Sequence, residues 1–325
     1  MSFRILVARQ RGMCAGVDRA IRVVEKTLER YGKEQVYVLH EVVHNRHVVE
    51  DLRAQGARFV DTLEDVPCGS VLIFSAHGVS IETWQEAARR GLTVVDATCP
   101  VVSGIHRKMN RAGDQHLEVV VIGHPGHQEV IGTIGQYRGP RDQVHVILKP
   151  EDVADLHLDA GGGRAMFTTQ TTLSADETAK TVAALRQAFP AIRGPRTDDT
   201  CNATQLRQNA VRELAGLCDL VIIAGSANSS NSNRLREVAA SRGVRAELVD
   251  DYRGIDPEWL KGVRTLGISA GASAPEYVVE EIVQWLREHG GAEVCESGAA
   301  VKEKHFLLPK EIRDSGPEQE PHRRD

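Results

Sequence analysis

The stretch VVDATCPVV at residues 94–102 joins an apolar run to a helical pattern, and a cysteine stands at the joint. The stretch RTDDTCNAT at 196–204 repeats the phrase Asp-x-Thr-Cys, again directly before a helical pattern. A third cysteine occupies the same kind of joint in RQRGMCAGVDRA at 9–20. The chain therefore places a cysteine between a strand and a helix three times, which predicts three similar structural units.

Short apolar runs alternate with helical patterns along most of the chain. The runs are continuous in Val, Ile and Leu, as strands buried in parallel sheets are. Strands are expected at 4–8, 36–43, 71–75, 93–96, 118–123, 144–148, 164–168, 220–225, 246–250 and 265–269. Helices are expected over 18–31, 101–112 and 204–217, and the stretches SADE at 174–177 and SAPE at 273–276 resemble capping boxes that open two more.

Strands that alternate with helices predict an α/β fold with parallel sheets. We expect three similar α/β domains in a pseudo-threefold arrangement, spanning residues 1–97 with Cys14, 98–196 with Cys99 and 197–290 with Cys201. Residues 291–325 are predicted to form a C-terminal tail, and its charged, proline-containing end is expected to be disordered.

The composition of the 325-residue chain limits its class. A net charge of −5 gives no electrostatic reason to expect nucleic acid or an anionic membrane as a partner. The longest apolar runs are shorter than the roughly 20 residues that a membrane-spanning helix needs. The six cysteines form no C-x-x-C pair, and we expect a cytoplasmic protein whose thiols stay reduced.

The three joint cysteines are candidate metal ligands. A helix N-terminus offers unpaired N–H groups and a partial positive charge, which lower the pKa of a thiol and favour the thiolate that binds iron or zinc. Three thiolates leave one position open on a zinc ion or on a cubane cluster, and an open position is typical of catalysis. Cys68, Cys218 and Cys295 lack this placement and are interpreted as structural thiols.

Polar side chains follow several predicted strands. The clusters are HEVVHN at 40–45, FSAHGVS at 74–80, GHPGHQE at 123–129, TTQTTLS at 168–174, SANSSNSN at 226–233 and SAGASAPE at 269–276. The last two precede helices, and a helix N-terminus lined by Ser and Asn is suited to anions. Two such sites together with histidines suit a diphosphate. The chain has neither a Walker A loop nor a G-x-G-x-x-G motif, so the sequence does not support nucleotide binding.

From about residue 4 to residue 310, the chain resembles the 4-hydroxy-3-methylbut-2-enyl diphosphate reductases, the IspH/LytB family. The matching blocks occur in order and are RGMCAGVDRAI, HEVVHNRHVV, FSAHGVS, DATCP, IGHPGHQEVIGTIGQ, TTQTTLS, DDTCNAT, NSSNSNRL and SAGASAPE. The resemblance implies three α/β domains around a central [4Fe–4S] cluster, with Cys14, Cys99 and Cys201 as its ligands.

The resemblance also implies the remaining site residues. The diphosphate would be bound by His44, His77, His127, Ser229, Ser230, Asn231 and Ser273. Glu129 would deliver protons, and Thr171 would position the substrate hydroxyl or relay a proton. Because a proton donor must hold its proton near neutral pH, we predict that a dry site and the diphosphate charge raise the pKa of Glu129.

The implied reaction is the reductive dehydroxylation of (E)-4-hydroxy-3-methylbut-2-enyl diphosphate to isopentenyl and dimethylallyl diphosphate, the last step of the non-mevalonate (methylerythritol phosphate) isoprenoid pathway. The open iron would bind the substrate oxygen. The chain shows no nicotinamide or flavin motif, so electrons are expected from a separate protein of the ferredoxin or flavodoxin type.

Two other functions remain open from the residues alone. A zinc hydrolase with three cysteines, or two cysteines and a histidine, would be colourless and hold about one zinc ion. A non-catalytic diphosphate or iron–sulfur sensor would absorb visible light but would not reduce the substrate. Spectroscopy with metal analysis and one reductase assay would separate the three.

Overall fold

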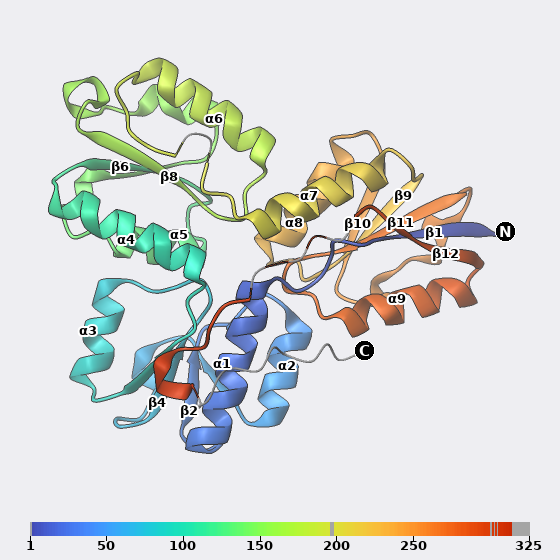
Figure 1. Cartoon of the computed structure of the whole chain (residues 1–325), viewed down its shortest axis with the longest axis horizontal. Helices are drawn as coiled ribbons and strands as arrows, with labels where there is room; N and C mark the ends of the chain where they lie inside the picture. Colours follow the sequence, from blue (N-terminus) through green and yellow to red (C-terminus); the bar gives the residue numbers. More distant parts are fainter. Residues whose placement is uncertain (1, 196–197, 300, 302, 304, 314–325) are drawn as a thin grey trace.

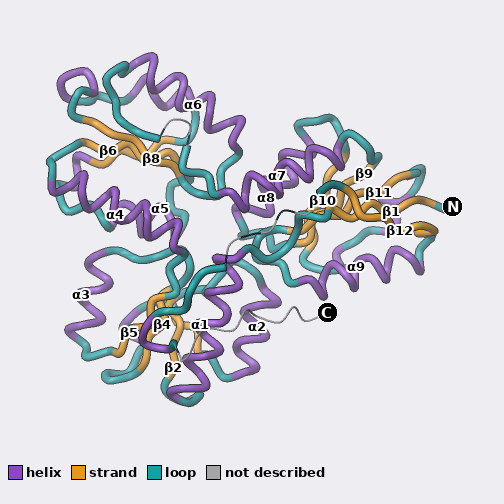
Figure 2. The backbone as a smooth tube through the Cα atoms, viewed as in Figure 1, coloured by secondary structure: helices purple, strands orange, loops and turns teal. Residues whose placement is uncertain are grey.

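The computed structural model describes residues 2–195, 198–299, 301, 303 and 305–313, which form three lobes around a common centre (Figure 1). Each lobe is built on its own sheet, every paired strand in the three sheets is parallel, and loops connect the lobes (Figure 2). The predicted α/β class with three parallel sheets is therefore confirmed. None of the described helices is long and apolar enough to cross a membrane.

The first lobe holds a four-stranded sheet in the order β3-β2-β4-β5. Its strands are β2 (Val36–Leu39), β3 (Arg58–Val60), β4 (Val71–Phe74) and β5 (Thr93–Asp96), and its helices are α1 (Ala15–Tyr31), α2 (Arg46–Gln55) and α3 (Ile81–Arg89). All four residues of β4 are buried, because helices cover both faces of the sheet.

The second lobe holds a three-stranded sheet in the order β7-β6-β8. Its strands are β6 (Glu118–Ile122), β7 (Val144–Ile147) and β8 (Ala165–Thr169), and its helices are α4 (Pro100–Asp114), α5 (Gln128–Gly135) and α6 (Ala175–Ala188). Helix α4 begins with proline at its first position, where the missing N–H removes no intrahelical hydrogen bond.

The third lobe holds a five-stranded sheet in the order β10-β9-β11-β1-β12. Its strands are β1 (Phe3–Ala8), β9 (Leu220–Ala224), β10 (Arg245–Val249), β11 (Thr265–Ala270) and β12 (Gly291–Ser297), and its helices are α7 (Asn202–Ala215), α8 (Ser230–Ala240) and α9 (Glu276–Glu288). Strand β9 is buried over its whole length and lies between β10 and β11.

The placement of β1 corrects the predicted division of the chain. Residues 3–8 were expected in the first domain, but they pair with β11 and β12 in the third lobe. Five of the six residues of β1 are buried, so the strand needs a neighbour on each side and helices on both faces, which an edge of the first sheet would not provide. The predicted tail is corrected as well, since its residues 291–297 form β12.

The segment after β12 crosses from the third lobe to the first, as Figure 1 shows. Leu308 and Ile312 are buried there in the core of the first lobe, beside Val24 and Leu28 of α1. The remainder of the predicted disordered end, residues 314–325, lies outside the described residues.

Two predicted element boundaries are wrong in ways that concern the site. Strand β2 ends at Leu39, because His40 has a φ of +58° and turns the chain. Helix α9 begins at Glu276 behind Pro275, so Ser273 is not its N-cap residue. Both departures leave polar residues in loops at the carboxyl ends of strands, where parallel folds build their sites.

Candidate active site

The three joint cysteines take equivalent places in the structure. Cys14, Cys99 and Cys201 are the N-cap residues of α1, α4 and α7. The backbone N–H of each cysteine donates to a carbonyl of another loop, at Ala272 (3.0 Å), Ala76 (3.0 Å) and Thr171 (3.1 Å) respectively. The joints are thereby fixed to loops that carry predicted substrate-binding or catalytic residues.

The three thiols lie near one another. The position that a Cβ atom would take at Gly16 lies 2.7 Å from the Sγ of Cys99 and 3.8 Å from the Sγ of Cys14. A side chain at Gly16 would thus occupy the space between two thiols. The thiols of Cys14 and Cys201 both act on Cys99 and raise its pKa. Residues far apart in the sequence therefore meet at one centre.

The spacing of these side chains bears on the kind of metal centre. Within the described residues, no three His, Cys, Asp or Glu side chains come close enough together to hold a single metal ion. In an iron–sulfur cluster each cysteine binds a different iron atom, so the sulfurs lie farther apart than the ligands of one ion. The cluster and the mononuclear zinc site that the sequence left open both stay predictions.

The prediction that helix N-termini lower the thiol pKa is wrong for two of the cysteines. Burial raises the pKa of Cys99 to about 12, and the N–H groups of Val101 and Val102 oppose this only in part. Burial also raises the pKa of Cys201. Desolvation outweighs the helix dipole at these two cysteines, and a bound cation would favour their thiolate forms.

Three histidines from two lobes form a second cluster. The rings of His44 and His77 stack with centroids 4.2 Å apart, and His127 meets them edge-on at 5.5 and 5.8 Å. Burial lowers the pKa of His127 to about 4 and that of His77 well below its ordinary value, and the neighbouring histidines lower both further. An anion placed among them would reverse this effect, because it stabilises the imidazolium form.

The third lobe brings its hydroxyl and amide groups to these histidines. The hydroxyl of Ser273 donates to the backbone carbonyl of His44 at 2.9 Å, which explains why Ser273 does not cap α9. Asn231 accepts from the N–H of Ala272 at 2.8 Å. Ser229 caps α8, and the hydroxyl of Ser230 lies 3.0 Å from that of Thr172 in the second lobe. All seven residues predicted to bind the diphosphate lie on these loops and helix starts.

Among the residues predicted to bind the diphosphate, two buried polar atoms have no hydrogen-bond partner in the described part of the chain. They are Nε2 of His127 and Nδ2 of Asn231. Leaving a buried donor or acceptor unpaired costs about 1–3 kcal/mol, so such atoms are typical of sites that a polar ligand completes. Both atoms belong to residues predicted to bind the diphosphate.

Glu129 is the most deeply buried acid of the site, with 3% of its surface exposed. One carboxylate oxygen accepts from the backbone N–H of Thr171 at 2.7 Å, and the other from the Thr171 hydroxyl at 2.8 Å. Burial raises the pKa of Glu129 to about 7, although both hydrogen bonds lower it. The predicted rise in pKa is confirmed, and burial alone is sufficient to produce it.

Some residues near the site received no role from the sequence. Glu41 accepts from Asn228 at 2.8 Å and lies 3.0 Å from Nδ1 of His44, so it helps to orient that ring. Gln170 accepts from the N–H of His124 and donates to Thr172 at 3.0 Å. The three-residue spacing of Glu41 and His44 was the one available signal, since a helical turn or a tight loop brings such pairs together.

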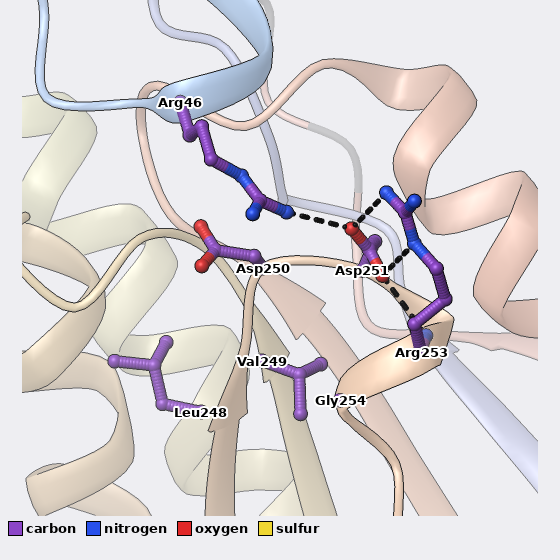
Figure 3. Close-up of a pocket in the computed structure, with 7 residues that line it drawn as sticks. All are labelled: Arg46, Leu248, Val249, Asp250, Asp251, Arg253 and Gly254. Atoms are coloured by element: carbon purple, nitrogen blue, oxygen red, sulfur yellow. Dashed lines mark hydrogen bonds and ion pairs between the residues drawn. The ribbon is translucent and has the colours of Figure 1, made fainter.

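A separate cavity of about 480 Å³ lies between the first and third lobes (Figure 3). Arg46, at the start of α2, reaches across it to Asp251 at 2.9 Å, and Arg253 holds the same carboxylate from the other side. His47 lies 3.3 Å from Asp251. The pKa of Asp251 falls to about 2, chiefly through its hydrogen bonds with Arg253. This network holds the segment that follows His44, and it contains no predicted site residue.

Comparisons with known proteins agree with the geometry. The LytB protein family matches residues 5–287. The chain is 51% identical over 309 residues to the 4-hydroxy-3-methylbut-2-enyl diphosphate reductase of Aeromonas hydrophila subsp. hydrophila, covering 95% of this chain and 99% of that protein. It is 51% identical over 311 residues to the enzyme of the same name from Azoarcus sp., covering 96% and 98%.

The chain is also similar to solved structures of diphosphate reductases. The structure of the E-1-hydroxy-2-methyl-but-2-enyl-4-diphosphate reductase from Plasmodium falciparum superposes with a TM-score of 0.90 at 33% identity, covering 96% of this chain and 97% of that one. A structure described as (E)-4-hydroxy-3-methyl-but-2-enyl diphosphate reductase, the terminal enzyme of the non-mevalonate pathway, superposes with a TM-score of 0.61 at 30% identity, covering 88% and 99%.

Proposed function

The chain belongs to the LytB family and is an oxidoreductase that reduces 4-hydroxy-3-methylbut-2-enyl diphosphate, and we propose that the residues gathered between its three lobes carry out this reaction. The products are isopentenyl and dimethylallyl diphosphate, and the step is the terminal one of the non-mevalonate pathway. The convergence of three helix-capping cysteines beside a buried glutamate is the observation that supports this site most strongly.

We propose that Cys14, Cys99 and Cys201 hold a [4Fe–4S] cluster. The donor set fits, since the three thiols lie near one another and the absence of a side chain at Gly16 leaves room beside Cys14 and Cys99. When bound, the cluster supplies electrons one at a time and the Lewis acidity of an iron that has no protein ligand.

The diphosphate is proposed to lie among His44, His77 and His127 and the starts of α8 and α9. The unpartnered Nε2 of His127 and Nδ2 of Asn231 would each gain a hydrogen bond from it. His77 and His127, whose pKa values are lowered by burial, would take up protons more readily as the anion enters, because their positive charge is then stabilised. The remaining contacts would come from Ser229, Ser230 and Ser273, whose hydroxyl groups lie at the same loops.

Glu129 is proposed to hold the proton that the reaction consumes. Removing the hydroxyl group as water takes two electrons and one proton, and completing the product takes one further proton at carbon. With a pKa of about 7, the carboxyl group is protonated in a large fraction of molecules near neutral pH. The Thr171 hydroxyl, 2.8 Å from Glu129, would orient the substrate hydroxyl and pass the proton between them.

The electrons are proposed to come from a ferredoxin or flavodoxin, since none of the sequence motifs of a nicotinamide or flavin site occurs in the chain. A cytoplasmic location is proposed on the basis of the cysteines, all six of which are free thiols, as is usual in a reducing compartment.

Anaerobic purification with iron and sulfide analysis, followed by a turnover assay with reduced viologen, tests the proposal. We expect about four iron atoms and four sulfides per chain, visible absorption and conversion of the diphosphate to both products. A colourless protein with one zinc ion would support a hydrolase instead. A coloured protein without turnover would support a sensor.

A further inference from the structure

Three cationic side chains link the cysteine joints in a cycle. Each helix that begins at a cysteine carries one cation that binds the segment just before the next cysteine. We propose that Arg19, Lys108 and Arg207, here called the cationic ring, are positioning residues that hold the three cysteines in register for the cluster. This inference rests on the proposed function and adds residues that neither the motifs nor the comparisons assign.

Arg19 joins the first cysteine joint to the second. It lies on α1, five residues after Cys14, and is 8% exposed. Its guanidinium donates to the backbone carbonyl of Thr98 at 3.1 Å and to that of Asp96 at 3.3 Å. Thr98 directly precedes Cys99, so the position of α1 determines where the second cysteine lies.

Arg207 joins the third joint to the first. It lies on α7, six residues after Cys201, and only 1% of its surface is exposed. It donates to the carbonyls of Gly12 at 2.7 Å and Met13 at 3.0 Å, directly before Cys14. A buried guanidinium is strongly unfavourable unless its donors are satisfied, so these bonds hold the loop firmly.

Lys108 joins the second joint to the third. It lies on α4, nine residues after Cys99, and forms an ion pair with Asp199, two residues before Cys201. Asp199 is itself held, because its carboxylate accepts from the Thr168 hydroxyl at 2.7 Å and its N–H donates to Thr169 at 2.8 Å. Lys108 is about half exposed, so its contribution is the smallest of the three.

The crossing segment at the C-terminal end completes the ring. Glu303 accepts from Arg207 at 2.7 Å and from Gln10 at 2.7 Å, and the carbonyl of Leu307 accepts from Arg19 at 2.8 Å. The same segment is anchored in the first lobe through buried Leu308. The segment thus contacts both buried arginines. Residues of the predicted tail therefore help to hold the two arginines that position the cysteines.

Lysine substitutions of the arginines test this arrangement, because one ammonium group cannot reproduce the several fixed donors of a guanidinium. In the reconstituted full-length protein, Arg19→Lys and Arg207→Lys are expected to lose iron to a chelator on the order of 10-fold faster than the wild type. Turnover number should fall while KM for the diphosphate stays the same. Arg212→Lys is the matched control, because Arg212 lies on α7 but pairs with Asp176 at the surface.

A second readout needs no metal. In the metal-free protein, mass spectrometry would measure the rate at which iodoacetamide labels each cysteine. Arg207→Lys should raise labelling of Cys14 above that of the other two, and Arg19→Lys should do the same for Cys99. General destabilisation would raise labelling of all three together and would overturn the proposal. A wild type that binds no iron would refute the proposed function yet leave this labelling pattern measurable.

If Arg207→Lys does not fold, Glu303→Gln and Lys108→Gln replace it, since both residues are more exposed than Arg207. Each is expected to raise the rate of iron loss and the labelling of the cysteine that it helps to position, Cys14 for Glu303 and Cys201 for Lys108. The proposal would be overturned if every variant lost iron and reacted with iodoacetamide at the wild-type rates. An equal rise of these rates in Arg212→Lys would overturn it as well.

Discussion

The cysteines and the histidines lie in the same central region, yet the chain builds the two groups differently. Each cysteine caps a helix at the start of α1, α4 or α7, so one local design is used three times. The histidines come from two lobes only, and the third lobe contributes serines and an asparagine instead. A repeated joint suits ligands that must be equivalent, whereas a diphosphate beside an allylic alcohol is asymmetric and needs a different set of donors on each side.

The two regions also differ in how their charges are balanced. The cysteine joints are held by cations that donate to backbone carbonyls and carboxylates around them. In the histidine cluster, burial lowers the pKa of His77 and of His127, and Nε2 of His127 has no hydrogen-bond partner among the described residues. We therefore expect substitutions in the first region to change metal content and those in the second to change substrate affinity, and the following predictions test that separation.

The largest effect is expected for Cys99→Ser. The hydroxyl is a poor ligand for iron in place of a thiolate, so the cluster should be lost together with essentially all turnover. Iron analysis and the visible spectrum of the anaerobically purified variant measure this, with Cys68→Ser as the control because Cys68 is exposed and lies in the loop before β4, not at a helix start. Full iron content in Cys99→Ser would contradict its assignment as a ligand.

The next largest effect is expected for Glu129→Gln. The amide keeps the shape of the side chain but cannot deliver a proton, so turnover number should fall about 100- to 10,000-fold. Iron content and substrate affinity should stay close to wild type, which places Glu129 in the chemistry and not in assembly. Single-turnover kinetics would measure this, and unchanged turnover would remove Glu129 from the mechanism.

A smaller effect is expected for His127→Asn. Asparagine keeps an acceptor that can cap α5 but does not place a donor where Nε2 lies. Loss of one charge-assisted hydrogen bond to the diphosphate should weaken binding about 10- to 100-fold. Titration calorimetry with the substrate would measure the loss. A fall in iron content instead of affinity would show that the two regions are not separate.

The pH dependence of turnover tests whether Glu129 is the group that supplies the proton. Its pKa is raised to about 7, so the protonated fraction is nearly complete at pH 6 and falls about tenfold per pH unit well above 7. Turnover number should therefore be flat on the acid side and decline on the alkaline side. The decline should be absent from the residual activity of Glu129→Gln, and its persistence there would assign it to another group.

The smallest effect on the reaction is expected for Asp251→Asn. Removing this buried charge should lower the free energy of unfolding by about 1–3 kcal/mol, because Arg46 and Arg253 lose their shared partner. The pKa of Asp251 is depressed to about 2, so its contribution to stability is full above pH 4 and is lost as the pH falls toward 2. Denaturant unfolding should show a clearly larger difference from wild type at pH 7 than at pH 2.5, and iron content at pH 7 should be unchanged.

The predictions from sequence were accurate where the signal was local. The alternation of apolar runs and helical faces predicted parallel sheets, and the Asp-x-Thr-Cys phrases placed Cys99 and Cys201 at helix starts as found. The predictions were wrong where a strand could pair in more than one sheet. The run at 4–8 reads as a buried strand in any sheet, and only the fold decides that it lies between β11 and β12.

Residues close together in the chain were enough to predict the repeated cysteine joint and the polar loops at the strand ends. The same local motifs identified the family. The tertiary structure decided the rest. It packed Glu129 deeply enough to raise its pKa, and it buried Cys99 and Cys201 enough to overcome the helix dipole. It also brought Arg19 and Arg207 to loops 79 and 194 residues away. Burial and contacts across such separations depend on the whole fold, and no local pattern encodes them.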